Sequence, residues 1–452
     1  MNLKTKIARL AGRSSKYLLH RFTTGGSSLP GKLALAIDPN ILTSLSKDYR
    51  TIIITGTNGK TVTTGLTVNI LKQHYNHVLT NPTGANMQQG IVSTFLSDNK
   101  DTGSEEKFAV LEVDEASVKH ITKYISPEII LVTNIFRDQM DRYGEIYTTY
   151  NLILEGVKKS PDTILMMNGD APIFSTPDVP NERRYFGFQN NDKKTDILAH
   201  YNTDGIICPQ CENILHYHMI TYSNLGDFFC PHCGFSRPAL SYTLTSIDEL
   251  TTESSLFTID GEQYNLQVAG QYNIYNALAA FSIAQYLDVP SKLIKTGVHS
   301  AKRIFGRQES LYINGNDVRI NLIKNPVGFN QIIELIKLET EPYILITILN
   351  DRHADGQDIS WIWDGNFEDI AADTLNRGAY VSGIRMQDLQ TRMKVAGFNE
   401  EQLFSIKEPR DVLSLIRNSP AKKVYVLATY TGMLDLRKEM VEQGILKERM
   451  NI

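Results

Sequence analysis

The sequence has only four cysteines among its 452 residues, and all four stand in two CxxC pairs. So few thiols provide no disulfide framework, and in a reducing compartment such pairs are typical of metal binding. No apolar run reaches the roughly 18 residues that a membrane-spanning helix needs. The N-terminus also lacks the apolar block and small-residue cleavage site of a secretion signal. These absences predict a cytoplasmic protein.

An excess of charge is also missing, since 46 Lys and Arg residues stand against 50 Asp and Glu, a formal net charge of -4. That balance excludes an overall basic surface for nucleic acid. Acidic residues are absent before Asp38, whereas seven basic residues precede it, interleaved with leucines and Tyr17. Two interpretations of this basic arm stay open: a helix face in water, or peripheral contact with anionic lipid or a pyrophosphate-bearing substrate at the inner face of the membrane.

A chain of this length is too long for one ordinary core, so two or three domains are expected. The apolar run 51–54, a glycine-rich turn and a helical stretch to about residue 74 predict a strand, a loop and a helix. The runs 108–113 and 129–135 have the character of buried parallel strands and end in polar residues. Ligands of such sheets bind at the carboxyl ends of the strands, so we expect the active cleft there.

The strand and helix pattern breaks between about residues 195 and 240, where both CxxC pairs lie, and a further α/β block begins near residue 307. We therefore expect a basic N-terminal arm, a central α/β domain with an inserted metal ribbon, and a C-terminal α/β domain. The predicted bounds are 1–48 for the arm, 49–305 for the central domain, about 197–240 for the ribbon, and 306–452 for the C-terminal domain.

The segment Thr55–Thr61 reads TGTNGKT and lies between the expected strand and helix. Loop N–H groups and a helix N-terminus at such a junction face an anion. The GxxxxGK[ST] pattern is incomplete, because its first glycine falls on Ile54, but TGTNGKT is the form of one ATPase branch. Lys60 is then expected to reach the β- and γ-phosphates, and the Thr61 hydroxyl to ligate Mg²⁺. The predicted ATP-binding loop consists of Gly56, Thr57, Asn58, Gly59, Lys60 and Thr61.

A magnesium ion held by one hydroxyl and phosphates still needs a carboxylate. Glu112, at the end of the second predicted strand, is the preferred candidate. Asp114 and Glu115 are the alternatives, and acidic residues at a strand end can also be plain solvated caps.

Cys208-x2-Cys211 and Cys230-x2-Cys233 are 18 residues apart, a spacing typical of a four-cysteine zinc ribbon. Four thiolates close a tetrahedron and leave no open position for catalysis, so structural zinc is predicted. With every thiol bound to zinc, no cysteine remains as a nucleophile, and the chain itself cannot be a cysteine-type glutaminase. The insert has no Lys/Arg cluster for nucleic acid. Nearby alternative ligands are His216, His218 and His232.

In their order along nearly the whole chain, these motifs resemble the Mur ligase family. The resemblance implies a Mur-ligase-like P-loop ATPase domain with a parallel central sheet and a Rossmann-like C-terminal domain. The segment 270–280 resembles the family's GxxNxxNxLAA stretch, in which the residue at Asn273 meets the adenine. The segment 305–309 resembles the GRxE turn, in which Arg307 reaches the phosphates.

Two departures from the family pattern are informative. The segment 138–141 reads DQMD where the family usually has DHxD, and no lysine stands at the spacing of the carbamylated lysine, so a second magnesium site is not carried over. Only about 50 residues precede the ATP loop, too few for the separate UDP-recognition domain of the amino-acid-adding ligases.

The ribbon and the segments 324–326 and 355–364 resemble one branch of the family. Members of that branch are thought to amidate the D-glutamate α-carboxylate of lipid II to D-isoglutamine through an acyl phosphate, in a heterodimer with a GatD-like glutaminase that supplies ammonia. In that branch an aspartate completes the partner's Cys-His pair; Asp355 is the preferred candidate and Asp358 the second, which with Ser360 can instead cap a helix. Two other functions stay open: an amino-acid-adding Mur or folylpolyglutamate-type ligase, and an ATP-gated zinc-ribbon scaffold without chemistry.

Overall fold

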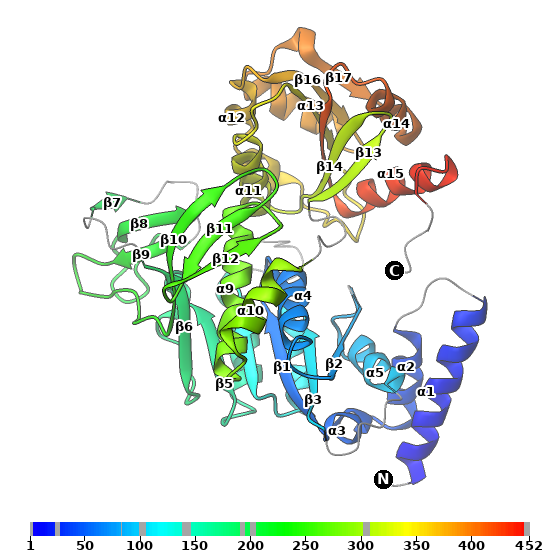
Figure 1. Ribbon diagram of the computed structural model, residues 1–452, viewed down its shortest axis with the longest axis vertical. Helices are drawn as coiled ribbons and strands as arrows, with labels where there is room; N and C mark the ends of the chain where they lie inside the picture. Colours follow the sequence, from blue (N-terminus) through cyan, green and yellow to red (C-terminus); the bar gives the residue numbers. More distant parts are fainter. Residues whose placement is uncertain are drawn as a thin grey trace.

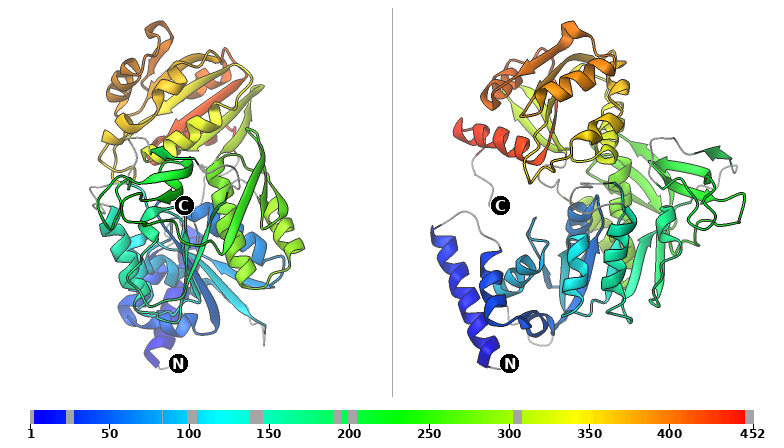
Figure 2. Two further views of the ribbon diagram at one scale, coloured as in Figure 1. Left: turned by 90° about the vertical axis from the view of Figure 1, so that its left-hand side faces the viewer. Right: turned by 180° about the vertical axis from the view of Figure 1, so that it is seen from behind.

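The computed structural model describes residues 3–22, 28–82, 84–98, 105–137, 146–189, 195–198, 205–301 and 308–446. These residues form a nine-stranded sheet, a six-stranded sheet and a small three-stranded sheet, with helices between and around them (Figure 1). The six-stranded sheet and its helices lie across the end of the nine-stranded sheet at which α4 begins, as two further views also show (Figure 2).

The nine-stranded sheet has a parallel part in the order β6-β5-β4-β1-β3-β2. Side chains of β1 alternate between the two faces: Ile52 and Ile54 belong to one buried cluster and Ile53 to the other. Both faces are thus covered, which explains the continuous apolar runs. The strands are β1 (Tyr49–Thr55), β2 (His77–Thr80), β3 (Lys107–Glu112), β4 (Ile129–Val132), β5 (Ile164–Asn168) and β6 (Arg183–Phe188).

Helices cover this parallel part on both faces. On the face of Ile52 and Ile54 lie α4 (Lys60–Leu71), α9 (Gln271–Tyr286) and α10 (Ser291–His299). The other face carries α5 (Gln88–Ser97), η1 (Glu115–Ser117), α6 (Val118–Ile121), α8 (Ile146–Val157) and η2 (Pro172–Phe174).

Beyond β6 the sheet continues with three strands of a different kind. β10 pairs with β6 in parallel, and β11 and β12 then follow as an antiparallel meander. Their bounds are β10 (Tyr242–Leu250), β11 (Ser255–Ile259) and β12 (Glu262–Leu266). Between β6 and β10 the chain forms the small antiparallel sheet of β7 (Ile197–Leu198), β8 (His216–Tyr222) and β9 (Leu225–Phe229).

The C-terminal sheet has the order β13-β14-β18-β15-β16-β17 and is parallel except for β13. Its strands are β13 (Glu309–Ile313), β14 (Asn316–Leu322), β15 (Tyr343–Ile348), β16 (Asn376–Ser382), β17 (Leu403–Ile406) and β18 (Lys423–Ala428). One face packs on α11 (Pro326–Ile336), η3 (Ser360–Asp364), α12 (Phe367–Ala371) and α13 (Met386–Val395), the other on α14 (Pro409–Arg417) and α15 (Tyr430–Glu442), and η4 (Glu400–Gln402) precedes β17. The predicted fold class, two α/β units with a parallel central sheet, is therefore confirmed.

Three helices precede β1: α1 (Leu3–Phe22), α2 (Leu29–Ile37) and α3 (Ile41–Ser46). They pack on one another and on α5, so they form a side layer of the central unit (Figure 1). Among the helices of the described ranges, none combines the length and apolarity needed to cross a membrane.

Candidate active site

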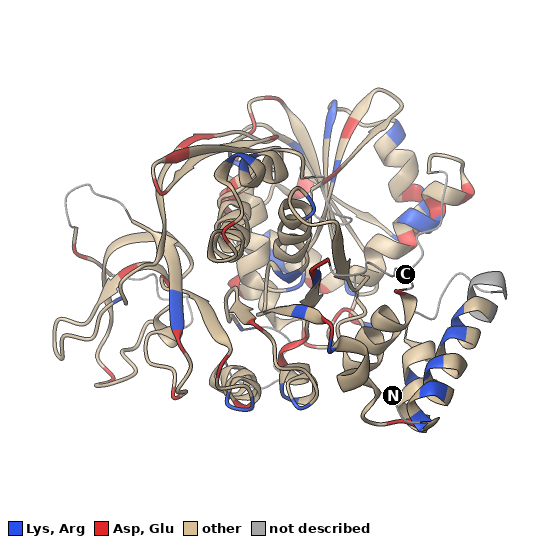
Figure 3. Ribbon diagram, turned by 60° about the horizontal axis from the view of Figure 1, so that its bottom comes forward, with Lys and Arg blue, Asp and Glu red and all other residues tan. Residues whose placement is uncertain are grey.

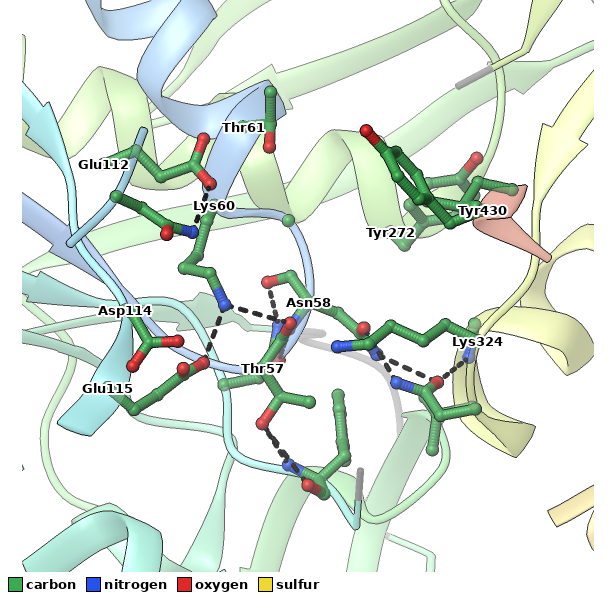
Figure 4. Close-up of a pocket in the computed structure, with 18 of the residues that line it drawn as sticks. Thr57, Asn58, Lys60, Thr61, Glu112, Asp114, Glu115, Tyr272, Lys324 and Tyr430 are labelled. Carbon is green, nitrogen blue, oxygen red and sulfur yellow. Dashed lines mark hydrogen bonds and ion pairs between the residues drawn. The ribbon is translucent and has the colours of Figure 1, made fainter. Parts of the chain in front are cut away.

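A cavity of about 560 Å³ lies where the central unit meets the C-terminal unit (Figure 4). The central unit contributes the loop from Thr57 to Thr61 and the carboxyl end of β3. The C-terminal unit contributes the turn after β14, the loop after β15 and the start of α15. Other lining residues used below are Glu112, Asp114, Glu115, Tyr222, Tyr272, Asn276, Lys324, Asn325, His353 and Tyr430.

The loop after β1 has the conformation that a phosphate loop needs. Gly56 and Gly59 adopt φ values of +125° and +84°, which favour glycine, and a Cβ at either would collide with a neighbouring side chain. The segment after β4 fixes the loop through two hydrogen bonds. The Asn58 backbone N–H donates to Asn134 Oδ1 at 2.8 Å, and Thr133 Oγ1 donates to the Asn58 carbonyl at 2.8 Å. The predicted strand, loop and helix are thus confirmed.

Lys60 points into the cavity and forms an ion pair with Glu115, with 2.7 Å between Nζ and Oε1 (Figure 4). Both side chains are largely buried. Burial lowers the pKa of Lys60, but the charge and hydrogen bond of Glu115 outweigh it, and the net shift of the Lys60 pKa is upward. The ion pair therefore favours the protonated form of Lys60, the form in which a lysine binds phosphates.

Three carboxylates were candidates for magnesium, and the structure separates them. Glu115 holds Lys60, and Asp114 caps η1 by accepting the Ala116 N–H at 3.2 Å. Glu112 lies buried at the end of β3, near Thr61 in the view of Figure 4, and Asn86 Nδ2 contacts its Oε1 at 3.5 Å. The pair of Thr61 hydroxyl and Glu112 carboxylate consists of hard oxygen donors, as Mg²⁺ prefers, so the residues present fit that ion.

The sequence interpretation placed Asn273 at the nucleotide, but a different residue of the same helix lines the cavity. Asn273 is buried beside it and donates to the Ala269 carbonyl at 2.7 Å. Asn276, one turn later, lines the cavity, donates to Asn273 Oδ1 at 3.2 Å and accepts from Thr63 Oγ1 at 3.2 Å. The second asparagine of the GxxNxxN pattern was the available signal. The adenine contact of Asn273 stays a prediction.

Two predicted segments lie outside the described residues. They are Arg307, expected at the phosphates, and residues 138–141, which replace the DHxD pattern. Their predicted roles are therefore carried forward as predictions.

The four cysteine sulfurs lie within 4.8 Å of one another. Zn–S bonds of about 2.3 Å place the sulfurs of a tetrahedral site about 3.8 Å apart, so the cluster fits zinc. Both CxxC turns have the same form: the residue after each second cysteine, Glu212 or Gly234, has positive φ and donates its N–H to the first cysteine's carbonyl, at 3.0 and 3.1 Å. Hydrogen bonds from the Asn213 backbone and side chain lower the pKa of the Cys211 thiol and so favour the thiolate form that a metal ligand requires.

The histidines that were alternative ligands do not join this cluster. His216 pairs with Asp196 at 2.6 Å, and His218 stacks on Phe229 with ring centroids 4.3 Å apart. The cluster of possible metal ligands found in the described ranges contains only the four cysteines.

The insert is anchored to the central unit by a buried ion pair that the sequence did not reveal. Arg237, which follows the second CxxC pair, donates to Asp170 Oδ1 at 2.9 Å, and Tyr275 of α9 donates to Asp170 Oδ2 at 2.6 Å. The β8–β9 hairpin thereby lies against α9, and Tyr222 near its tip lines the cavity. The four-cysteine insert thus contributes to the wall of the cavity.

Asp355 and Asp358 occupy different surroundings in the loop after β15. Asp355 is buried, and its carboxylate accepts the Thr431 N–H at 2.6 Å and the Arg352 N–H at 3.1 Å. It therefore faces the start of α15. Asp358 is exposed and accepts the Ser360 N–H at 2.8 Å, the capping contact that was its alternative role.

Comparisons with known proteins agree with this architecture. The Mur ligase middle domain matches residues 54–284, and the MurT ligase C-terminal domain matches residues 322–433. Among solved structures, a pseudomurein peptide ligase type C from Methanothermus fervidus is similar with TM-score 0.65 at 19% identity, covering 90% of this chain and 81% of that one. A MurF ligase from Thermotoga maritima, solved with ADP, has TM-score 0.63 at 14% identity, covering 91% and 85%. The fold is that of the Mur ligases.

The curated relatives narrow this class. The chain is 49% identical over the full length of both chains to the Streptococcus pneumoniae protein named lipid II isoglutaminyl synthase (glutamine-hydrolyzing) subunit MurT. It is 34% identical to the Staphylococcus aureus protein of the same name, over 96% of each chain. The chain belongs to the MurT family of Mur ligases, and that fold implies ATP and Mg²⁺.

Proposed function

We propose that this chain is the ligase subunit of a lipid II isoglutaminyl synthase. It activates the D-glutamate α-carboxylate of the lipid II stem peptide with ATP and converts it to the amide of D-isoglutamine with ammonia from a GatD-like glutaminase. The observation that carries the proposal is the full-length similarity to two relatives of that name, combined with a formed phosphate loop at the cavity.

The chemistry explains why ATP is needed. A carboxylate is a poor electrophile near neutral pH, because its negative charge repels a nucleophile and its oxygen is a poor leaving group. Transfer of the γ-phosphoryl group makes an acyl phosphate; attack by ammonia then forms the C–N bond and releases phosphate. Free ammonia is mostly ammonium in the cytosol, so a partner that releases it inside a closed complex supplies the reactive form.

Residues of the cavity have definite tasks in this scheme. Protonated Lys60 and the N–H groups of the loop neutralise charge on the β- and γ-phosphates. Thr61 and Glu112 would hold Mg²⁺, which screens the negative charge of the phosphates when bound. Asn273 and Arg307 are proposed to contact the adenine and the phosphates, and Lys324 lies across the cavity from the loop, where it would add positive charge (Figure 4).

The zinc site is proposed to be structural. It would be held by Cys208, Cys211, Cys230 and Cys233, and its effect on the reaction would be indirect, through the position of the β8–β9 hairpin. The proposed division of the chain is a basic arm (1–48), a central ATP-binding domain (49–305) with the ribbon, and a C-terminal domain (306–452) that docks the glutaminase.

Asp355 is proposed to orient the catalytic histidine of the glutaminase partner, with Asp358 as the second candidate. A carboxylate that positions an imidazole must itself be fixed. Thr431 and Arg352 fix Asp355 in this way. This supports Asp355 over the exposed Asp358.

Mass spectrometry of lipid II after incubation with ATP, Mg²⁺, glutamine and the co-purified complex tests the function. We expect the slight mass loss of a hydroxyl replaced by an amino group, dependent on ATP and on the partner. Asp355→Asn should abolish glutamine-dependent product while leaving product formed from added ammonium salt, and Asp358→Asn serves as the matched control. An unchanged mass, or addition of a whole amino acid, would contradict the proposal.

A further inference from the structure

The outer side of α1 carries a row of exposed apolar side chains, here called the α1 row. Its members are Leu3, Ile7, Leu10 and Tyr17, with exposed fractions of 74, 51, 69 and 67%. Their spacing of four, three and seven residues keeps them on one side of a helix with 3.6 residues per turn. Apolar side chains gathered in this way indicate a surface that another phase or molecule covers.

The helix cannot turn to bury this row, because its opposite side is already fixed. Thr5 Oγ1 donates to Asp38 Oδ2 at 2.6 Å, and Ala8 is fully buried. Gly12 packs so closely on Leu96 and Pro30 that a Cβ there would collide. The exposed row is therefore a property of the folded protein.

The charge of α1 has a single sign. The helix contains five lysines and arginines up to Lys16 and no acidic residue, and Figure 3 shows this blue series along it. Lys4 and Lys6 are exposed beside the row. Arg13 instead donates to the carbonyls of Leu96 and Asp98, at 3.2 and 3.0 Å, and so holds α1 on the C-terminal end of α5.

The same helical layer leads to the active site. Gly31 of α2 donates its N–H to Ser93 Oγ of α5 at 2.8 Å, and α2 adds exposed Leu29 and Leu33. The residue before α5, Met87, is 51% exposed and lines the cavity. A membrane or molecule that binds α1 would therefore also lie close to the rim of the cavity at Met87.

We propose that the α1 row, with Lys4 and Lys6, docks in the headgroup region of an anionic lipid bilayer. An apolar row beside a basic border on a surface helix is the pattern of helices that lie in the plane of a membrane interface. A second copy of this chain is disfavoured as the occupant, because two helices whose charged residues are all basic would repel each other. The role of this docking rests on the proposed function: a protein that acts on a substrate with a lipid anchor reaches it from the bilayer surface.

Vesicle flotation tests the docking without any chemistry. The full chain in complex with its glutaminase partner is floated with vesicles of phosphatidylcholine alone or with 30% phosphatidylglycerol (about one anionic lipid in three). We expect at least tenfold more bound protein on the anionic vesicles, decreasing with salt. Ile7→Glu/Leu10→Glu should abolish this binding, and Lys4→Glu/Lys6→Glu should reduce it at least tenfold. Tyr312→Glu, at a residue 77% exposed on β13, is the matched control and should float like the parent.

Amidation assays separate this inference from the proposed function. With lipid II in anionic vesicles, Ile7→Glu/Leu10→Glu should lose activity at least tenfold, whereas turnover of a water-soluble short-chain analogue should stay within twofold of the parent. Three results would overturn the docking. The first is unchanged flotation of both double variants, and the second is binding of the parent to uncharged vesicles that equals its binding to anionic ones. The third is a dimer of the parent that Ile7→Glu/Leu10→Glu converts to a monomer. A lack of amidation with the soluble analogue by the parent would instead overturn the proposed function.

Discussion

Asn58 of the phosphate loop and Asn325 of the C-terminal unit exchange two side-chain hydrogen bonds: Asn325 Nδ2 donates to Asn58 Oδ1 at 3.0 Å, and Asn58 Nδ2 donates to Asn325 Oδ1 at 3.3 Å. The same Asn325 oxygen accepts the Gly328 N–H at 2.8 Å and caps α11. The pair therefore joins the nucleotide loop to the unit that is proposed to bind the glutaminase.

We expect Asn325→Ser to lower ATP turnover about tenfold, a loss of about 1.4 kcal/mol of transition-state stabilisation, because the two units no longer hold the loop between them. Serine retains an oxygen that can cap α11, so the melting temperature should change little. Steady-state kinetics of Asn58→Ser, Asn325→Ser and the double variant check this. Fully additive losses would show that the pair does not act as a unit.

Glu112→Gln should raise the Mg²⁺ concentration for half-maximal ATP turnover at least tenfold, because the substitution removes the charged oxygen ligand beside Thr61. Asp114→Asn is the matched control, since its side chain caps η1. Titration of turnover with Mg²⁺ compares the two. A larger shift for Asp114→Asn than for Glu112→Gln would show that Asp114, not Glu112, is the carboxylate that binds Mg²⁺.

Purified protein should contain one zinc per chain by elemental analysis, and Cys208→Ser/Cys230→Ser should contain none. Loss of zinc frees the β8–β9 hairpin, whose Tyr222 lines the cavity. We therefore expect a higher KM for substrate with a smaller change in kcat. Full activity without zinc would show that the insert does not shape the active site.

Arg237→Met should destabilise the central unit by about 3–5 kcal/mol, because it leaves the fully buried Asp170 carboxylate without its cation. Lys158→Met breaks a pair with the exposed side chain of Asp178 and should leave the free energy of unfolding nearly unchanged, because water screens that pair. Chemical denaturation measures both. Equal losses would mean that the Asp170–Arg237 pair does not anchor the insert.

The sequence predicted best where chemistry depends on neighbours along the chain. The loop Thr55–Thr61 and the two CxxC pairs are local patterns, and the structure forms both as expected. Contacts between residues that lie 67 and 267 positions apart in the sequence left no comparable signal. The pairing of Asn58 with Asn325 and of Asp170 with Arg237 depends on how the units and the insert pack.

Burial was the other limit. Spacing indicated carboxylates after β3, but only the fold shows that Glu115 is paired with Lys60 and that Glu112 lies buried near Thr61. The same holds for Asp355, which was expected to present its carboxylate to a partner. In the structure Asp355 is buried against Thr431.

The most direct test of the account traces the oxygen atoms of the D-glutamate α-carboxylate. Lipid II labelled with ¹⁸O in the D-glutamate α-carboxylate is converted by the complex with ATP and glutamine, and the released phosphate is analysed by mass spectrometry. The account predicts one labelled oxygen in each phosphate and one in the amide product, because ammonia displaces the phosphate that carries a carboxylate oxygen. Unlabelled phosphate would contradict activation of that carboxylate as an acyl phosphate.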